Sequence, residues 1–239
     1  MTRRLRLGAL AALALLPVAW KPWAYGRLFG YRIDPTARIG LTILDAAEVD
    51  IGPAVTIGHG NLVLRVGRLS IGAHARIGVL NVLRGGDEIA IGGHVDILRR
   101  NELTSIVDPD PVTVPDPRLD IGDGSVITDG HRLDFTDRLQ LGRQVIVGGR
   151  ASSLWTHNRQ RTAPVSVGDG TYLGSECRMA PGSALPARSI VALGSVVSGR
   201  IEGDASLIGG VPAARLRALD ADEAELAGRR TRDDLPDDV

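Results

Sequence analysis

The feature that most constrains this chain is an aliphatic residue followed by glycine, which returns at fixed intervals. The pairs begin at Ile39, Ile51, Ile57, Ile71, Ile77, Ile91, Ile121, Leu141, Val147, Val167 and Leu173. The short step between pairs is six residues, as from Ile51 to Ile57, and the long step is twenty, as from Ile51 to Ile71. Twenty is three sixes plus two, and two extra residues recur just before the long-step pair, as Leu69-Ser70. Such a period is typical of a solenoid.

Three six-residue segments close a triangular coil, and stacked coils pair as parallel strands around one continuous core. The composition agrees, because the chain has 30 glycines but only three Trp, three Tyr and two Phe. A core without large rings must consist of small aliphatic side chains. We expect the glycine of each pair to turn a corner with a positive φ. The repeat predicts a solenoid domain over residues 33–214.

The N-terminal segment, residues 1–32, holds six basic residues and no acidic one. Its uncharged stretch Leu7–Trp20 has 14 residues, whereas a bilayer-spanning helix needs about 20. Trp20 and Trp23, with Lys21 and Arg27 nearby, suit the headgroup zone of a membrane. The segment therefore has three interpretations: a membrane-interface helix, a helix that caps the domain, or a signal peptide with a poor cleavage pattern.

Two other regions lie outside the repeat. Residues 215–239 are rich in acidic groups, and we expect a short helix within Ala218–Arg230 followed by a disordered tail, Thr231–Val239. Residues 99–118 contain a proline-rich stretch, which predicts a surface loop.

Charge and cysteine content exclude several classes of protein. The 28 basic and 28 acidic residues leave no net charge, so no nucleic-acid partner is expected. The single cysteine, Cys177, excludes a disulfide framework, and its inward position predicts an inert core residue. His74 and His94 lie twenty residues apart and should stack on one corner. They make a zinc site an alternative, but two exposed polar corner residues are the simpler interpretation, so no metal is expected.

His157 stands out among the five histidines. It ends the repeat segment Ser153–Asn158 and precedes a break in phase, because the step from Leu141 to Val167 is 26 residues. A histidine at the edge of a projecting loop is well placed to act in a cleft. A neutral imidazole, with a reference pKa near 6.5, is suited to general-base catalysis.

At this point the sequence resembles the hexapeptide-repeat acyltransferases, and among them the saccharide O-acetyltransferases. The resemblance covers Ile33–Gly58, Ile71–Gly78 and Ile121–Arg217. It is closest in the C-terminal half, where Thr156-His157 is followed by "VSVGDG", "YLGS", "PG", "GSVV" and "GVPA". The resemblance implies an all-β, left-handed parallel β-helix assembled as a homotrimer, to which the sequence adds an N-terminal apolar helix and a short C-terminal helix.

The same resemblance implies roles for individual residues. His157 would be the catalytic base, and the backbone N–H of Ser175 would stabilise the oxyanion. Asp134 and Trp155 would contact the acceptor. The implied contacts for acetyl-CoA are Gly174, Leu193, Gly194, Ser198 and Arg217. Family members commonly have Thr-Lys where Ser198-Gly199 stands, which leaves Arg200 as a substitute for the missing lysine.

The sequence thus predicts transfer of acetyl from acetyl-CoA to a hydroxyl of a saccharide or lipid-linked saccharide. The N-terminus fits a cytoplasmic enzyme of polysaccharide biosynthesis that binds the anionic inner face of the cell membrane. Three alternatives stay open: an N-acetyltransferase of a nucleotide-linked amino sugar, a gamma-carbonic-anhydrase-like zinc protein, and an inactive structural solenoid. The acceptor, the length of the acyl group and the role of residues 99–118 are left open.

Overall fold

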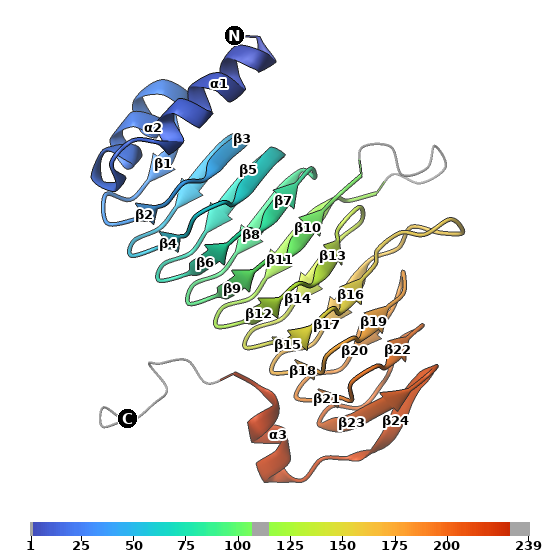
Figure 1. The fold of residues 1–239 in the computed structure, drawn as a ribbon. Helices are drawn as coiled ribbons and strands as arrows, with labels where there is room; N and C mark the ends of the chain where they lie inside the picture. The colour runs from blue at the N-terminus through green and yellow to red at the C-terminus, as the bar shows by residue number, and fades with distance from the viewer. Residues whose placement is uncertain (1, 107–114, 230–239) are drawn as a thin grey trace, which may run out of the picture.

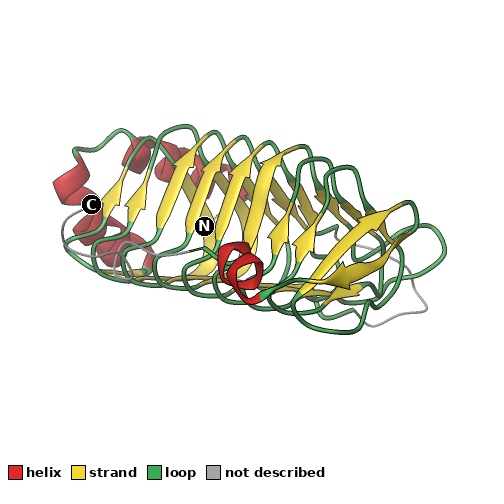
Figure 2. Ribbon diagram, turned by 90° about the horizontal axis from the view of Figure 1, so that it is seen from below, coloured by secondary structure: helices red, strands yellow, loops and turns green. Residues whose placement is uncertain are grey.

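The chain folds into a triangular solenoid of parallel strands, with helices at its two ends (Figure 1). The computed structural model describes residues 2–106 and 115–229. The strands form flat faces that meet at edges made of loops (Figure 2).

Three faces run the length of the solenoid. The first face holds β7 (Val82–Arg84), β10 (Glu102–Thr104), β13 (Arg132–Asp134), β16 (Ser153–Leu154), β19 (Arg178–Met179) and β22 (Val196–Val197). The second holds β1 (Arg32–Ile33), β8 (Glu88–Ile91), β11 (Arg118–Ile121), β14 (Leu139–Leu141), β17 (Val165–Val167) and β20 (Ala184–Leu185). Two long strands, β3 (Ile43–Ile51) and β5 (Leu62–Ile71), continue from the first face into the second.

The third face forms a separate sheet. It holds β2 (Arg38–Ile39), β4 (Thr56–Ile57), β6 (Arg76–Val79), β9 (Asp96–Arg99), β12 (Val126–Asp129), β15 (Ile146–Arg150), β18 (Tyr172–Leu173), β21 (Ile190–Val191), β23 (Ser206–Gly210) and β24 (Ala213–Ala218). All of its pairings are parallel except that of β24, which returns antiparallel to β23.

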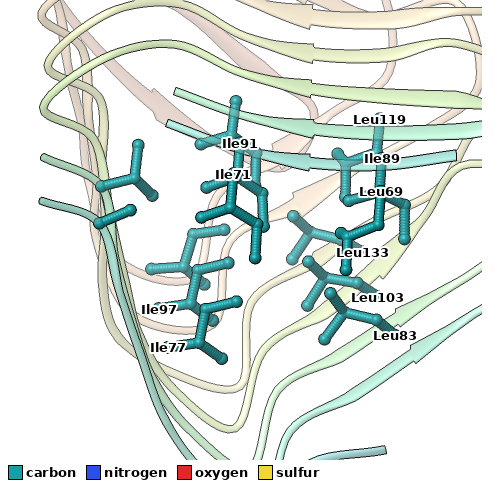
Figure 3. Close-up of a cluster of buried hydrophobic side chains, with 14 of the residues drawn as sticks. Leu69, Ile71, Ile77, Leu83, Ile89, Ile91, Ile97, Leu103, Leu119 and Leu133 are labelled. Atoms are coloured by element: carbon teal, nitrogen blue, oxygen red, sulfur yellow. The ribbon is translucent and has the colours of Figure 1, made fainter. Parts of the chain in front are cut away.

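The register of the strands aligns the repeated aliphatic residues into columns. Ile71 pairs with Ile91, and Ile91 pairs with Ile121, one coil further along. These side chains are at most 3% exposed. Figure 3 shows Ile71 and Ile91 one above the other in such a column. The predicted core of small aliphatic side chains is therefore confirmed.

The expectation that the glycine of each pair adopts a positive φ is wrong. The glycines of the pairs, such as Gly72 and Gly122, do not adopt a positive φ. The positive φ falls two residues later, as at His74 (60°) and His94 (56°). Glycine is required instead because the coils approach closely: a Cβ on Gly122 would lie 2.5 Å from the carbonyl carbon of Gly142 in the next coil.

Two helices and a 3-10 turn cover the N-terminal end of the solenoid: α1 (Arg3–Ala14), η1 (Val18–Trp20) and α2 (Lys21–Phe29). Lys21 is 1% exposed, and its ammonium donates to the carbonyls of Ile39 (3.0 Å) and Gly40 (2.5 Å). The Tyr31 hydroxyl donates to the Ala46 carbonyl (2.7 Å). These helices therefore pack as a cap on the first coil. Within the described residues, none of the helices has the length and apolar character needed to cross a bilayer.

The opposite end carries α3 (Ala221–Ala227), which lies within the segment predicted to be helical. The side chain of Asp220 accepts from the backbone N–H of Glu223, forming a capping box. Arg229 then reaches back to pair with Asp96 on β9. The predicted disordered tail, Thr231–Val239, lies outside the described residues.

The predicted bounds of the surface loop, residues 99–118, are too wide. Glu102–Thr104 forms β10, which pairs on both sides, and β11 begins at Arg118. The sequence missed β10 because the prolines that break the repeat begin only after it. Residues 107–114 lie outside the described part of the chain.

Candidate functional site

His157 and Asp134 meet where two neighbouring coils leave the first face. Strands β13 and β16 pair with Leu133 opposite Leu154, so Asp134 ends one strand and His157 follows the other by three residues. The Nδ1 atom of His157 lies 3.0 Å from Oδ1 of Asp134. The parallel register thus brings together two residues that are 23 positions apart.

Asp134 is 2% exposed, and its carboxylate is fully engaged. It accepts from the hydroxyls of Thr156 (2.7 Å) and Thr136 (3.1 Å) and from the backbone N–H of Thr136 (3.3 Å). The resemblance implied that Asp134 contacts the acceptor. Its placement favours a different task, which is to hold the imidazole of His157. The two threonines were missed by the sequence analysis.

The pairing fixes which nitrogen of His157 is basic. An ionised carboxylate only accepts hydrogen bonds, so Nδ1 carries the proton that Asp134 receives. The lone pair of the neutral ring is therefore on Nε2. The side chain is 20% exposed, and it lines a groove at the surface. This arrangement is able to take a proton from a molecule bound in the groove.

The break in phase after His157 is an ordered turn that projects from the solenoid (Figure 1). His157 and Thr162 form an antiparallel bridge. Between them, the amide oxygen of Asn158 accepts from the backbone N–H groups of Gln160 (2.8 Å) and Arg161 (3.0 Å). These bonds hold the turn beside the groove.

The groove has a volume of about 690 Å³. Its lining consists of Ile106, Trp155, His157, Asn158, Arg159, Arg178, Met179, Ala180, Pro181 and Val196. Trp155 approaches His157 edge to face, with 6.3 Å between the ring centroids. Of the predicted site residues, His157 and Trp155 thus share one groove, with Asp134 behind it.

A second group of predicted residues lies on a different edge. Gly174, Ser175, Leu193 and Gly194 occupy stacked corners, and the backbone N–H of Gly194 donates to the Ser175 carbonyl (2.9 Å). Ser175 precedes β19, whereas His157 follows β16 in the neighbouring coil, so the two residues lie at opposite edges of the first face. A single chain does not bring the predicted base and the predicted oxyanion donor together.

The last two predicted contacts for acetyl-CoA lie apart from that edge. Ser198 is exposed and follows β22, on the same edge as His157 but two coils away. The guanidinium of Arg217 forms two 2.6 Å hydrogen bonds with the carboxylate of Glu223. Any anion that binds Arg217 must therefore compete with Glu223.

The edge before the first face holds a buried ladder of polar side chains that the sequence analysis missed. The side chain of each member accepts from the backbone N–H of the next, in the order Asn61, Asn81, Asn101, His131 and Ser152, and the ladder ends at the N–H of Cys177. The regular spacing of Asn61, Asn81 and Asn101, twenty residues apart, was a usable signal. Cys177 is fully buried, as predicted, and burial raises the pKa of its thiol.

His131 in this ladder is 1% exposed, and burial lowers its pKa to about 4. Its Nδ1 accepts from the backbone N–H of Ser152 (3.1 Å), so Nε2 carries the proton and lies 2.9 Å from the Thr128 hydroxyl. His131 is therefore a neutral structural residue.

His74 and His94 stack as predicted, with ring centroids 4.9 Å apart. Among the described residues, no group of three or more His, Cys, Asp or Glu side chains is arranged to hold a metal ion.

Comparison with solved structures supports the fold. The polysialic acid O-acetyltransferase OatWY matches with a TM-score of 0.56 and 15% identity, over 79% of this chain and 84% of that one. A UDP-N-acetylglucosamine acyltransferase from Campylobacter jejuni matches with a TM-score of 0.50 and 18% identity, over 82% of this chain and 80% of that one. No protein-family model and no curated protein matches the sequence. The likeness confirms the predicted left-handed parallel β-helix, the fold of hexapeptide-repeat acyltransferases.

Proposed function

We propose that this chain is an acyltransferase that moves acetyl from acetyl-CoA to a saccharide hydroxyl, with His157 as the general base. The observation that carries the proposal is the 3.0 Å contact between His157 and the buried carboxylate of Asp134, at the edge of a groove. The fold, which this chain shares with a saccharide O-acetyltransferase and an acyltransferase, supports the same reaction class.

The proposed chemistry needs no acyl-enzyme intermediate. Nε2 of His157 removes the proton as the hydroxyl oxygen attacks the thioester carbon. Collapse of the tetrahedral intermediate breaks the C–S bond, and the imidazolium returns the proton to the departing sulfur, giving the acetyl ester and free CoA thiol. Asp134 orients the ring and stabilises the imidazolium that forms when Nε2 takes the proton. Ser152, Cys177 and the rest of the buried ladder have no part in these steps.

We further propose that the active unit is a homotrimer. The backbone N–H of Ser175, the proposed oxyanion donor, lies on a different edge from His157 in one chain. In the trimer, an edge with His157 from one chain faces an edge with Ser175 and Gly174 from the next. Leu193, which is 78% exposed, and Gly194 would line the same cleft for acetyl-CoA. Light scattering should give three times 25.3 kDa, and a stable monomer would contradict this assembly.

The N-terminal cap has a second proposed role as a membrane-docking surface. Leu15, Trp20 and Trp23 are 77%, 63% and 74% exposed, although α2 buries its other side against the first coil. No acidic residue occurs in the first 32 positions, so an anionic lipid surface is the occupant that the charge favours. Such docking suits an enzyme of polysaccharide biosynthesis at the cytoplasmic face of the cell membrane.

Vesicle flotation tests this role without removing the cap. The full chain should float with vesicles of phosphatidylglycerol and phosphatidylcholine, and a double variant, Trp20→Ser with Trp23→Ser, should stay behind. Leu216→Ser is the matched control, because Leu216 is 60% exposed at the opposite end of the solenoid. If the double variant floats as well as the wild type, the cap has no docking role.

Release of free CoA thiol from acetyl-CoA tests the proposed activity. The panel of acceptors should include neutral, acidic, amino and lipid-linked saccharides, and mass spectrometry should identify whether the product is an ester or an amide. Wild-type protein should release thiol only when an acceptor is present. The His157→Asn variant should release no thiol even with the acceptor. Acetylation of an amino group would replace the hydroxyl as the acceptor, and thiol release by His157→Asn at the wild-type rate would remove His157 from the mechanism.

A further inference from the structure

The groove beside His157 combines an aromatic wall with two cationic side chains. Trp155 forms part of one wall, and Met179, Pro181 and Val196 supply apolar surface. Arg159 and Arg178 bring two guanidinium groups to the same lining. The described lining residues include no Asp or Glu, so the groove presents positive charge to whatever it binds.

Trp155 is held as a platform from behind. The guanidinium of Arg132 on β13 lies 4.9 Å from the centre of its ring. Arg132 is itself 3.6 Å from the carboxylate of Glu102 on β10, the preceding strand of the face. An indole fixed in this way offers a flat apolar surface to the C–H face of a sugar ring.

The two arginines reach the groove from rigid positions on different elements. Arg159 belongs to the turn that Asn158 closes through its amide oxygen. Arg178 is on β19, paired with Ser153 of β16 on one side and Val196 of β22 on the other. Neither guanidinium has an ion pair with an acidic side chain of the described residues, unlike Arg132 and Arg138. Two exposed cations with no carboxylate partner among the described residues therefore line one groove.

We propose that the acceptor is an acidic saccharide: its ring packs on Trp155 and its anionic group binds Arg159 and Arg178, which places a hydroxyl at Nε2 of His157. This inference rests on the proposed function, whose acceptor class it specifies. The shared chemistry is an anionic oxygen group, either the carboxylate of an acidic sugar or a phosphate on the sugar. A planar guanidinium binds both through paired N–H groups.

The rival occupant of the arginines is the phosphate of acetyl-CoA, and kinetics separates the two. If the acceptor binds there, Arg159→Gln and Arg178→Gln raise the KM for the acceptor and leave the KM for acetyl-CoA unchanged. The expected rise is about tenfold for each arginine, as for the loss of one charge-assisted hydrogen bond. The value of kcat should change little, because neither side chain touches the reacting atoms. Arg143→Gln is the control, since Arg143 is exposed on another edge.

Binding of the full-length protein to a glycan array provides a readout that does not depend on catalysis. The array should carry sialylated, uronic-acid, phosphorylated and neutral glycans, including carboxylates paired with their methyl esters. We expect binding to acidic glycans, loss of binding when the carboxylate is esterified, and loss in the Arg159→Gln/Arg178→Gln double variant but not in Arg143→Gln. Comparison of the uronic-acid and sialylated glycans with the phosphorylated glycans on the array shows whether the protein binds a carboxylate or a phosphate.

The outcomes separate this inference from the proposed function. Acidic glycans that bind through the two arginines but are never acetylated would uphold the inference about the ligand and contradict the acyltransferase. Acetylation of neutral glycans as efficient as that of acidic ones would uphold the acyltransferase and overturn the inference. A rise in the KM for acetyl-CoA alone, or no preference for acidic glycans on the array, would also overturn it.

Discussion

The two edges that bound the face of β13 and β16 each carry a histidine, and the two histidines differ in almost every respect. His131 stands before β13, is 1% exposed, and is held between the Ser152 N–H and the Thr128 hydroxyl. His157 follows β16, has a partly exposed side chain, and pairs with the carboxylate of Asp134. One edge is a closed ladder that uses both ring nitrogens, whereas the other leaves Nε2 at the edge of a groove.

The difference shows that position in the coil decides the chemistry of the same side chain. In the ladder, protonating Nδ1 of His131 would set an N–H against the N–H of Ser152, so the neutral form is enforced. Beside the groove, the carboxylate of Asp134 holds Nδ1 of His157 and leaves Nε2 available to a molecule in the groove. Variants of the two histidines should therefore separate stability from turnover.

The largest effect is expected from His157→Ala. The side chain lies at the edge of a surface groove, so its removal should leave the melting temperature and the oligomeric state nearly unchanged. Turnover should fall by about a hundred- to ten-thousand-fold, the usual contribution of a general base. The matched variant, His131→Ala, should lower the melting temperature while the remaining folded protein keeps its turnover. A reversal of the two phenotypes would overturn the comparison.

Asp134→Asn should come next. The amide of an asparagine can donate to Nδ1 of His157, which would favour the tautomer with the proton on Nε2 and remove the basic lone pair from the groove. We expect kcat to fall by roughly a hundred- to thousand-fold, with little change in the KM for acetyl-CoA. Asp137→Asn is the control, because the carboxylate of Asp137 accepts from the backbone N–H groups of Asp116 and Arg138 and, among the described residues, does not bond His157. Equal losses in both variants would point to a structural role.

The pH dependence of stability tests the role of the buried histidine, His131. The pKa of His131 is lowered to about 4 in the fold, below its unfolded value near 6.5. The unfolded chain therefore takes up the proton first as the pH falls, so stability present above pH 6.5 is lost between about pH 6.5 and 4. The loss from this group is about 3 kcal/mol.

Urea unfolding at a series of pH values measures this loss. His131→Asn is the informative variant, since asparagine occupies the same ladder position in three earlier coils. The variant should lose most of the decline between pH 6.5 and 4, whereas His157→Asn should keep it. An unchanged decline in His131→Asn would assign it to other groups.

The smallest effect is expected at Cys177. Its thiol donates to the Ala192 carbonyl (3.3 Å) within the ladder edge, and burial raises its pKa. Iodoacetamide should label it in urea but not in the native protein. Cys177→Ser should keep turnover within about threefold of the wild type, because the proposed reaction uses no thiol nucleophile. Rapid labelling of the native protein would show that this edge opens.

Much of the fold could be predicted from the sequence because a solenoid repeats the same local structure in each coil. The spacing of the aliphatic–glycine pairs predicted the coil, the core columns and the stack of His74 on His94, all of which depend on contacts between equivalent positions one coil apart. The glycines illustrate the limit. The sequence marks where they stand, but their reason, the close approach of Gly122 to Gly142, exists only between coils.

The site was predicted less completely. His157 was identified from a break in phase, which is a local signal. Its bond to Asp134 and the support of Thr136 and Thr156 were not, because they depend on the register between β13 and β16. The ladder at Asn61, Asn81 and Asn101 was visible as a spacing, yet its continuation through His131 and Ser152 changes residue type at each coil and leaves no pattern to follow.

The sequence by itself determined the solenoid, its core and the place where the repeat is interrupted, since each follows from residues a fixed number of positions apart. Only the tertiary structure decided which histidine is buried and neutral and which lies at a groove beside a carboxylate. Nor did the sequence decide whether the N-terminal segment packs as a cap, which depends on Lys21 reaching the carbonyls of Ile39 and Gly40. The physical reason is that burial and hydrogen-bond partners come from neighbouring coils and elements, and a linear pattern does not record them.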